Sequence, residues 1–131
     1  MDLRILEIAS NTENNKVIDN FTHRSKNKNP ICGDEMEISL IIKNDKVLDM
    51  GYQCKSCVYC QASVSLLSQK IKNKRLVEIK NFIKLSENIF DNTKIVLEKN
   101  WRDFIELLDK KNVSRKECLL LPLRTVLKAI K

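Results

Sequence analysis

The first regular pattern along the chain is an alternation of apolar and polar residues over positions 35–43. A period of two is typical of a strand with one buried face. A second alternating run covers 46–53, and the turn residues Asn44 and Asp45 separate the two, which predicts an antiparallel hairpin. The side chains expected to face the core are Met36, Ile38, Leu40 and Ile42 in the first strand and Leu48, Met50 and Tyr52 in the second, with Val47 and Asp49 facing outward.

Helical spacing of apolar residues dominates the rest of the chain. It predicts a short helix over 2–10, a longer one over 57–72, another over 75–90, and a further helix built on Trp101, Phe104, Ile105 and Leu108. Residues 11–30 are polar and irregular, so we expect no regular element there. Three apolar side chains are expected to anchor that segment to the core: Val17, Ile18 and Phe21.

The last helix has the clearest start signal. Ser114 and Glu117 have the spacing of a capping box, and Val113 and Cys118 occupy the flanking staple positions. Pro122 falls about two turns into this helix and is expected to kink it, because proline lacks the N–H that the helix needs. Apolar residues continue at helical spacing to the end of the chain.

Strands first and helices afterwards favour an α+β fold: a small antiparallel sheet of about three strands, covered on one face by helices. With 43% hydrophobic residues and no linker or repeat, we expect a single domain over residues 1–131. No run approaches the roughly 18 apolar residues of a membrane span. Glu7 interrupts the opening segment where a signal peptide needs an apolar run. A soluble, cytoplasmic protein without membrane contact is the expectation.

The formal net charge of +7 can attract nucleic acid or an acidic protein face. The lysines are spread along the chain and not gathered in one strip. We therefore interpret most of them as solvated surface residues. A functional basic face stays the alternative.

Three cysteines and one aspartate carry the clearest candidate chemistry. Five cysteines in a cytoplasmic chain indicate metal binding or reactivity more than disulfides. Cys32 and Asp34 flank Gly33 in NPICGDE, Cys57 lies at a predicted helix start, and Cys118 lies near the start of the last helix. Thiolates and a carboxylate brought together from such ends are the ligand set of a zinc or iron–sulfur site.

Glycine is what makes the first of these segments suitable. In a plain strand Cys32 and Asp34 would lie about 6–7 Å apart on one face, which is awkward for one ion. Gly33 permits a tight bend that turns both donors inward, and Pro30 stiffens the approach. An ordinary Gly-Asp turn beside a buried cysteine is the alternative. For Cys57, the helix start stabilises the thiolate.

Two further cysteines form C-x₂-C-x₂-C with Cys57: Cys54 and Cys60. The run is part of a bacterial ferredoxin pattern but lacks the fourth cysteine and the following proline. We expect Cys54 and Cys60 to be packing residues, with an accessory redox or metal role as the alternative. His23, the one histidine, is expected to be solvated.

Three ordered motifs resemble the SufU/IscU/NifU N-terminal family of iron–sulfur cluster assembly proteins. They are NPICGDE (29–35), SCVYCQASVSLLSQKIKNK (56–74) and RKECLLLPLRTVLKAI (115–130). The resemblance covers about residues 29–74 and 115–131. It implies a SufE/NifU-like sandwich, with the family's ligand positions taken by Cys32, Asp34, Cys57 and Cys118.

Two features make the SufU type the nearer resemblance. The interval from Cys57 to Cys118 is long, and Glu117 stands where IscU-type scaffolds carry a histidine. The SufU type implies zinc held by three cysteines and the aspartate. The chain departs from the family at Cys54 and Ser56, where glycines are usual, and at Cys60, where a small residue is usual.

The resemblance implies two versions of one function. The chain is expected to accept persulfide sulfur from a PLP-dependent, SufS-like cysteine desulfurase, with Cys32 as the acceptor, or to carry a transient [2Fe–2S] cluster for downstream apo iron–sulfur proteins or a carrier. Whether it acts as a sulfurtransferase or as a non-enzymatic scaffold stays open. Three basic residues are expected to offset the charge of −2 of the occupied site: Lys55, Arg115 and Lys116.

A nucleic-acid-binding module with a structural metal is the alternative from another class. Aromatic residues make up 5% of the chain, which leaves few stacking platforms for single strands. Structural zinc sites usually contain only Cys and His, so Asp34 is unusual there. Both points disfavour this alternative.

Overall fold

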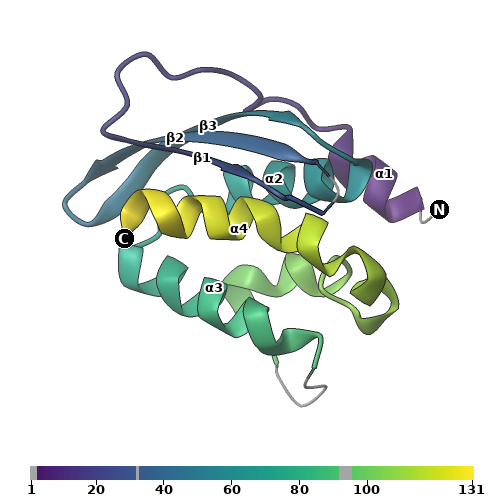
Figure 1. Ribbon diagram of the computed structural model, residues 1–131. Helices are drawn as coiled ribbons and strands as arrows, with labels where there is room; N and C mark the ends of the chain where they lie inside the picture. Colours follow the sequence, from purple (N-terminus) through teal and green to yellow (C-terminus); the bar gives the residue numbers. More distant parts are fainter. Residues whose placement is uncertain (1–2, 32, 92–95) are drawn as a thin grey trace.

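A three-stranded antiparallel sheet, in the order β1-β2-β3, forms one layer of the protein. Its strands are β1 (His23–Lys28), β2 (Glu35–Lys43) and β3 (Lys46–Lys55). In the computed structural model, which describes residues 3–31, 33–91 and 96–131, helices cover one face of this sheet (Figure 1). The predicted α+β arrangement is confirmed.

The hairpin of β2 and β3 forms where the alternation predicts it. Asn44 and Asp45 both have positive φ, 53° and 61°, which is the geometry of a type I′ turn. A bulge follows, because Ile41 pairs with Asp49 whereas Ile42 pairs with Val47. The extra residue between these pairs is Leu48.

The bulge overturns one detail of the predicted alternation. Val47 is buried and Leu48 is 46% exposed, the reverse of our expectation. One unpaired residue shifts the side chains on its turn-proximal side to the opposite face. Beyond the bulge the prediction holds, and Met50 and Tyr52 are buried.

Strand β1 lies in the segment for which we expected no regular structure. Its sequence HRSKNK has no apolar alternation, and it forms because β2 offers a free edge, from the pair His23–Leu40 to the pair Lys28–Glu35. A polar, lysine-bearing strand suits a sheet edge, since it discourages pairing with other chains.

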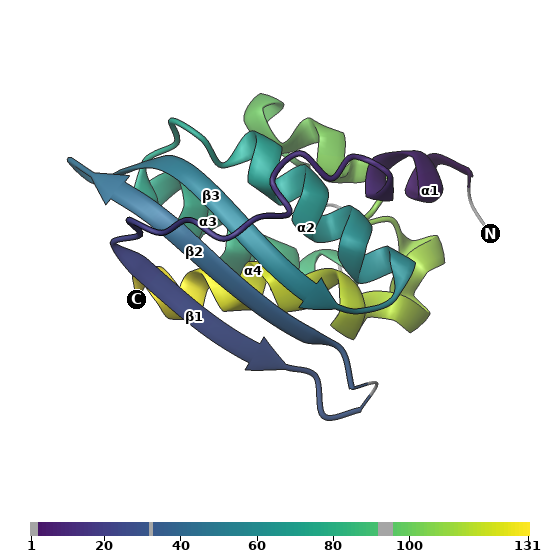
Figure 2. The same ribbon diagram turned by 90° about the horizontal axis from the view of Figure 1, so that it is seen from above.

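A strap of chain before β1 lies across the sheet (Figure 2). The Tyr52 N–H donates to the Asn14 carbonyl at 3.1 Å and so ties the strap to β3. Of the three predicted anchors Ile18 is buried, whereas Val17 and Phe21 are 57% and 40% exposed. The prediction that Val17 and Phe21 anchor the strap was wrong. Hydrogen bonds of Asn14 hold the strap instead, through its carbonyl to Tyr52 and through its side chain to Ser68.

The helices are α1 (Leu3–Ala9), α2 (Val58–Lys70), α3 (Leu76–Ile89) and α4 (Lys116–Ile130). The helix predicted around Trp101 is instead the 3₁₀ helix η1 (Lys99–Ile105), followed by a second, η2 (Lys110–Arg115). Ile105, which was predicted to lie on the apolar face of that helix, is 59% exposed. Among the described residues no helix is long and apolar enough to span a membrane.

Helix α2 is enclosed by its neighbours, and α4 packs against it and against β1 and β2. Hydroxyl groups fasten these layers: Ser63 Oγ donates to the Leu119 carbonyl at 2.7 Å, and Ser25 Oγ donates to the Thr125 carbonyl at 2.6 Å. Helix α4 runs through Pro122 as one element.

The predicted capping box at the start of α4 does not form. Ser114 lies inside η2, the N-cap is Arg115, and no side chain caps the helix. Val113 is 51% exposed and so makes no staple. Because η2 leads directly into α4, the Lys116 N–H finds an acceptor in the backbone of that preceding turn.

Gly51 is required by the close approach of the strap. A Cβ added there would lie 2.5 Å from the Lys16 carbonyl oxygen and 3.0 Å from Ile18. We predict that Gly51→Ala lowers the free energy of unfolding by about 1–3 kcal/mol, as overpacking does elsewhere. Urea denaturation measures the effect, with Gln53→Ala as a control on the same strand and face. Equal stability of the two variants would show that the strap moves aside freely.

Candidate metal site

The loop that joins β1 to β2 is closed by its own hydrogen bonds. The Asn29 N–H donates to the Asp34 carbonyl at 2.8 Å, and the Gly33 N–H donates to the Asn29 carbonyl at 2.8 Å. The Asn29 side chain accepts from the Ile31 N–H at 3.0 Å. Gly33 has φ +77°, a conformation that glycine adopts without strain. The bend at Gly33 is present as predicted, and the predicted inward turn of Cys32 lies outside the described residues.

The two carboxylate oxygens of Asp34 have different surroundings in the described part of the chain. The side chain is 7% exposed, and its Oδ1 accepts from the Cys57 N–H at 3.3 Å. Oδ2 is buried and has no hydrogen-bond partner among the described residues. A buried carboxylate oxygen without a donor is costly unless a cation or water satisfies it. Oδ2 is therefore a fitting ligand atom.

Two thiols meet this carboxylate from the starts of two helices. Cys57 is the N-cap of α2 and half-buried, and Cys118 is the third residue of α4 and buried. One oxygen of Asp34 and the two sulfur atoms lie within 4.8 Å of one another. Small side-chain rotations bring such a group around one ion at the usual bond lengths of about 2.0–2.3 Å.

Of the four predicted ligands the structure thus brings three together. Cys32 lies outside the described residues, so its place in the ligand set stays a prediction. Two sulfur atoms and one oxygen suit zinc or iron, which accept mixed thiolate and carboxylate ligands. The donor set of the described residues fits either metal.

Cys54 and Cys60 do not join this group of ligand atoms. Cys60 is fully buried in the core, and this burial raises the pKa of its thiol far above the ordinary range. Cys54 is half-buried, and burial followed by the nearby acidic groups raises its pKa as well. The Ser56 hydroxyl lies near both thiols but makes no hydrogen bond of normal geometry with described residues. Neutral thiols agree with the predicted packing role.

His23 lies at the first residue of β1, and the loop that carries Asp34 follows the other end of that strand. Its Nδ1 is 2.8 Å from the Thr22 hydroxyl. The group of candidate ligands in the described residues does not include it.

The three basic residues predicted to offset the site's charge lie in different settings. The Arg115 guanidinium lies over the Tyr59 ring, 5.4 Å from its centroid, and so beside the first turn of α2. Lys116 Nζ is 3.7 Å from Asp91 Oδ2, and Lys55 is exposed at the end of β3. Their charge-offsetting role stays a prediction.

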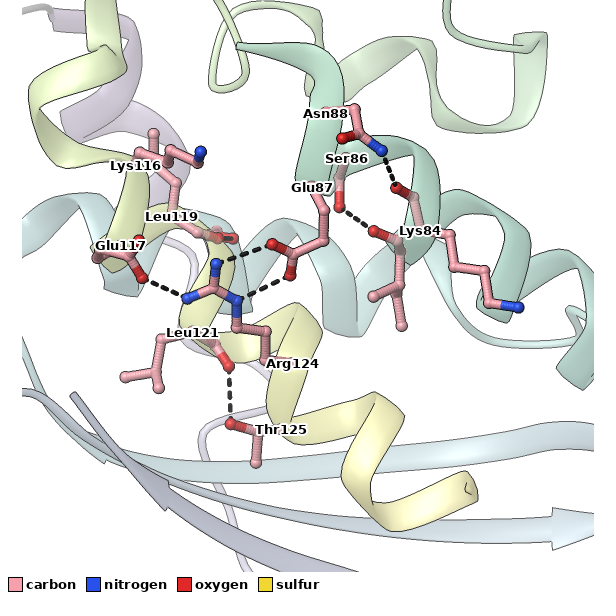
Figure 3. A network of polar contacts seen from close by, with 12 residues as sticks. Lys84, Ser86, Glu87, Asn88, Lys116, Glu117, Leu119, Leu121, Arg124 and Thr125 are labelled. Carbon is pink, nitrogen blue, oxygen red and sulfur yellow. Dashed lines mark hydrogen bonds and ion pairs between the residues drawn. The ribbon is translucent and has the colours of Figure 1, made fainter. Parts of the chain in front are cut away.

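A clamp centred on Arg124 fixes the start of α4, as Figure 3 shows. Its Nε and Nη2 donate to the two carboxylate oxygens of Glu87 at 2.8 Å each, and Nη1 donates to Glu117. The hydrogen bond from Arg124 lowers the pKa of Glu87, and the same bond raises the pKa of Arg124. Because Glu117 precedes Cys118, the clamp positions the thiol indirectly.

Sequence reasoning missed this clamp. From the sequence, Glu117 was interpreted only as the counterpart of the histidine in IscU-type scaffolds and as part of a capping box. In the structure its side chain accepts a hydrogen bond from Arg124. The seven-residue spacing of Glu117 and Arg124, two turns on one helix face, was the available signal. Nothing in the sequence pointed to Glu87, which comes from α3.

Comparison with known proteins decides the family. Residues 2–100 match the model of the NifU-like N terminal domain. The chain belongs to this family. The predicted resemblance is confirmed.

One relative and two solved structures are similar to nearly the whole chain. The iron–sulfur cluster assembly scaffold protein IscU of Thermotoga maritima is 29% identical over 133 residues, with 97% of this chain and 89% of that protein covered. The crystal structure of the SUF-system scaffold SufU of Fervidobacterium islandicum superimposes with a TM-score of 0.91 at 27% identity, covering 100% of this chain and 96% of the other. The N-terminal NifU-like protein of Brucella abortus shares the fold, with a TM-score of 0.90 at 20% identity, covering 98% and 90%.

Cys57 and Cys54 offer a matched pair for testing the ligand assignment. We predict that Cys57→Ser lowers zinc affinity at least about tenfold, since loss of a ligand costs no less than the 10–100-fold seen for outer-shell changes. Cys54→Ser should keep the affinity within about threefold of the original protein, because its sulfur lies outside the group. Competition with a chromophoric chelator measures both, and equal affinities of the two variants would contradict the assignment.

The Arg124 clamp has a pH signature. The folded-state pKa of Glu87 lies below its ordinary value of 4.5, so its contribution to stability is present above that pH and is lost as the pH falls below it. We predict that Arg124→Gln lowers the melting temperature at pH 7 and that this loss shrinks at pH 3. Arg102→Gln, at an exposed position in η1, is the control. A loss of equal size at both pH values would mean that the clamp acts through packing alone.

Proposed function

We propose that this chain is an iron–sulfur cluster assembly scaffold that accepts sulfur from a PLP-dependent cysteine desulfurase. The observation that carries the proposal is the convergence of Asp34, Cys57 and Cys118 from three separate segments. The Oδ2 atom of Asp34 supports it, since this oxygen is buried without a hydrogen-bond partner among the described residues. The relative in Thermotoga maritima is itself described as a scaffold.

The ligands proposed are Cys32, Asp34, Cys57 and Cys118. Zinc or iron bound there would keep the thiols ionised at neutral pH, because a coordinated thiol loses its proton. The three residues in the described part of the chain do the holding: α2 and α4 fix two sulfur atoms, and the Cys57 N–H orients the carboxylate. A carboxylate is a harder and weaker partner for iron than a thiolate, which suits a cargo that must leave.

Cys32 is the proposed sulfur acceptor. Its thiolate attacks the outer sulfur of the desulfurase persulfide; a new S–S bond forms, the old one breaks, and the desulfurase cysteine leaves as a thiolate. The step involves no net oxidation and needs no other reactant. The neighbours Ile31, 83% exposed, and Gly33, also exposed, support an acceptor in this loop, because a partner can reach it.

Two versions of this function remain within the proposal. In the first, zinc stays in place and the chain passes sulfur onward. In the second, a [2Fe–2S] cluster is assembled as cargo on the same four residues and handed to apo iron–sulfur proteins or a carrier. Anaerobic reconstitution with iron and sulfide separates them, since the cluster version requires visible absorption from thiolate-to-iron charge transfer.

We predict that Cys32→Ser abolishes the stimulation of desulfurase turnover. The reason is that serine cannot receive the sulfane sulfur, and the desulfurase persulfide then remains loaded. Alanine production from cysteine, measured with and without the variant, tests this. Cys54→Ser is the control and should stimulate normally. Full stimulation by Cys32→Ser would reject the assignment of the acceptor.

A further inference from the structure

Side chains of all three strands line a hollow of about 690 Å³. It lies on the face of the sheet that the helices leave uncovered (Figure 1). The strand register explains its floor, because side chains that alternate with the buried Met36 and Ile38 must face outward. Asn15 of the strap bounds one side. The outward side chains stand in two rows across the three strands: Lys26, Glu37 and Gln53, then Lys28, Glu35 and Lys55.

The second row adjoins the metal site. Lys28 immediately precedes the loop of residues 29–34, Glu35 follows Asp34, and Lys55 lies two residues before Cys57. The hollow therefore lies over the same strand ends that deliver two of the candidate ligands. A partner that covers the metal site from this end of the sheet also covers the hollow.

The hollow has an excess of exposed lysine side chains over glutamates. Lys26 and Lys28 contact Glu37 and Glu35 at 3.9 Å, with the two lysine side chains 69% and 64% exposed. Ion pairs this long and this exposed contribute little, so both lysines can exchange their partners. Lys55 forms no ion pair with any described residue, and Lys128 adds a fourth ammonium group at the edge.

We propose that this hollow is the docking surface for an acidic segment of the protein that exchanges sulfur or cluster with the metal site. This inference rests on the proposed function, because it assigns the place where that partner binds. Charge complementarity favours an acidic segment and gives specificity and a fast encounter. The amide side chains of Asn15 and Gln53 can form hydrogen bonds with the backbone of a bound peptide.

A protein segment fits this hollow better than a nucleic acid does. Glu35 and Glu37 stand in the floor between the lysines and would repel a continuous phosphate backbone, whereas a peptide can place neutral or basic residues against them. The residues that line the hollow include no aromatic ring on which a base could stack.

Two triple variants of equal net charge test the proposal. The first, Lys26→Glu with Lys28→Glu and Lys128→Glu, reverses the charge of the hollow and spares Lys55, which is predicted to offset the charge of the metal site. The second reverses three exposed lysines elsewhere, Lys43, Lys84 and Lys99, so it has the same net charge but an intact hollow. A fluorescent deca-glutamate peptide and a deca-uridine RNA are the probes, at low ionic strength.

We expect the hollow variant to bind the peptide about tenfold more weakly than the original protein does. Its affinity for the peptide should also be at least about fivefold lower than that of the control variant. Glu35→Gln should bind the peptide more tightly, an effect that misfolding cannot produce. Equal losses in both triple variants would show attraction by net charge alone and overturn the proposal. RNA binding that depends on the hollow more strongly than peptide binding does would overturn it as well.

The desulfurase assay separates this proposal from the proposed function. With the hollow variant, the concentration for half-maximal stimulation should rise about tenfold, while the maximal stimulation at saturation and the zinc content stay unchanged. An unchanged stimulation curve would reject the docking surface and leave the proposed function standing. If the original protein does not stimulate the desulfurase at all, the proposed function falls, and so does the docking of that partner.

Discussion

The site depends on one partly buried contact, in which the Asp34 carboxylate accepts from the Cys57 N–H. This bond joins the residue just before β2 to the N-cap of α2, two positions that the hairpin of β2 and β3 separates in the sequence. It also orients the carboxylate, so that Oδ1 meets the backbone and Oδ2 stays buried without a hydrogen-bond partner among the described residues. Burying this second oxygen without a hydrogen bond costs free energy, and this cost is the physical reason to expect an ion there.

The third ligand is held by a different set of contacts. Cys118 has its position from α4, which Ser63 fastens to α2 and which Arg124 fastens to α3 through Glu87. Both contacts lie within two turns of the thiol. An ion bound at the site would therefore link the sheet to helices that are already fixed relative to each other, which is how a scaffold keeps an exchangeable cargo in a constant geometry.

Local rules predicted the parts of the fold that depend on local chemistry. The hairpin follows from its alternation and turn residues, and the bend at Gly33 follows from glycine between two donors. Strand β1 could not be predicted in this way, because its polar residues become a strand only when β2 offers an edge. The inversion at Leu48 has a similar cause, since a bulge leaves no mark in the apolar pattern.

The site divides along the same line. Asp34, Cys57 and Cys118 were predicted from residue type and from their places at element ends, and these are properties of the sequence. The side chain of Glu117 contacts Arg124, which also binds Glu87 of α3. This contact between two helices forms in place of the predicted capping box. The spacing of Glu117 and Arg124 was visible in the sequence, but the partner Glu87 lies on α3 and carries no such signal.

The most direct test of the central claim is X-ray absorption spectroscopy at the zinc edge of the metal-loaded protein. We expect sulfur scatterers at about 2.3 Å together with one oxygen near 2.0–2.2 Å. A first shell made of oxygen and nitrogen alone, or one with the multiple-scattering pattern of a histidine ring, would contradict it.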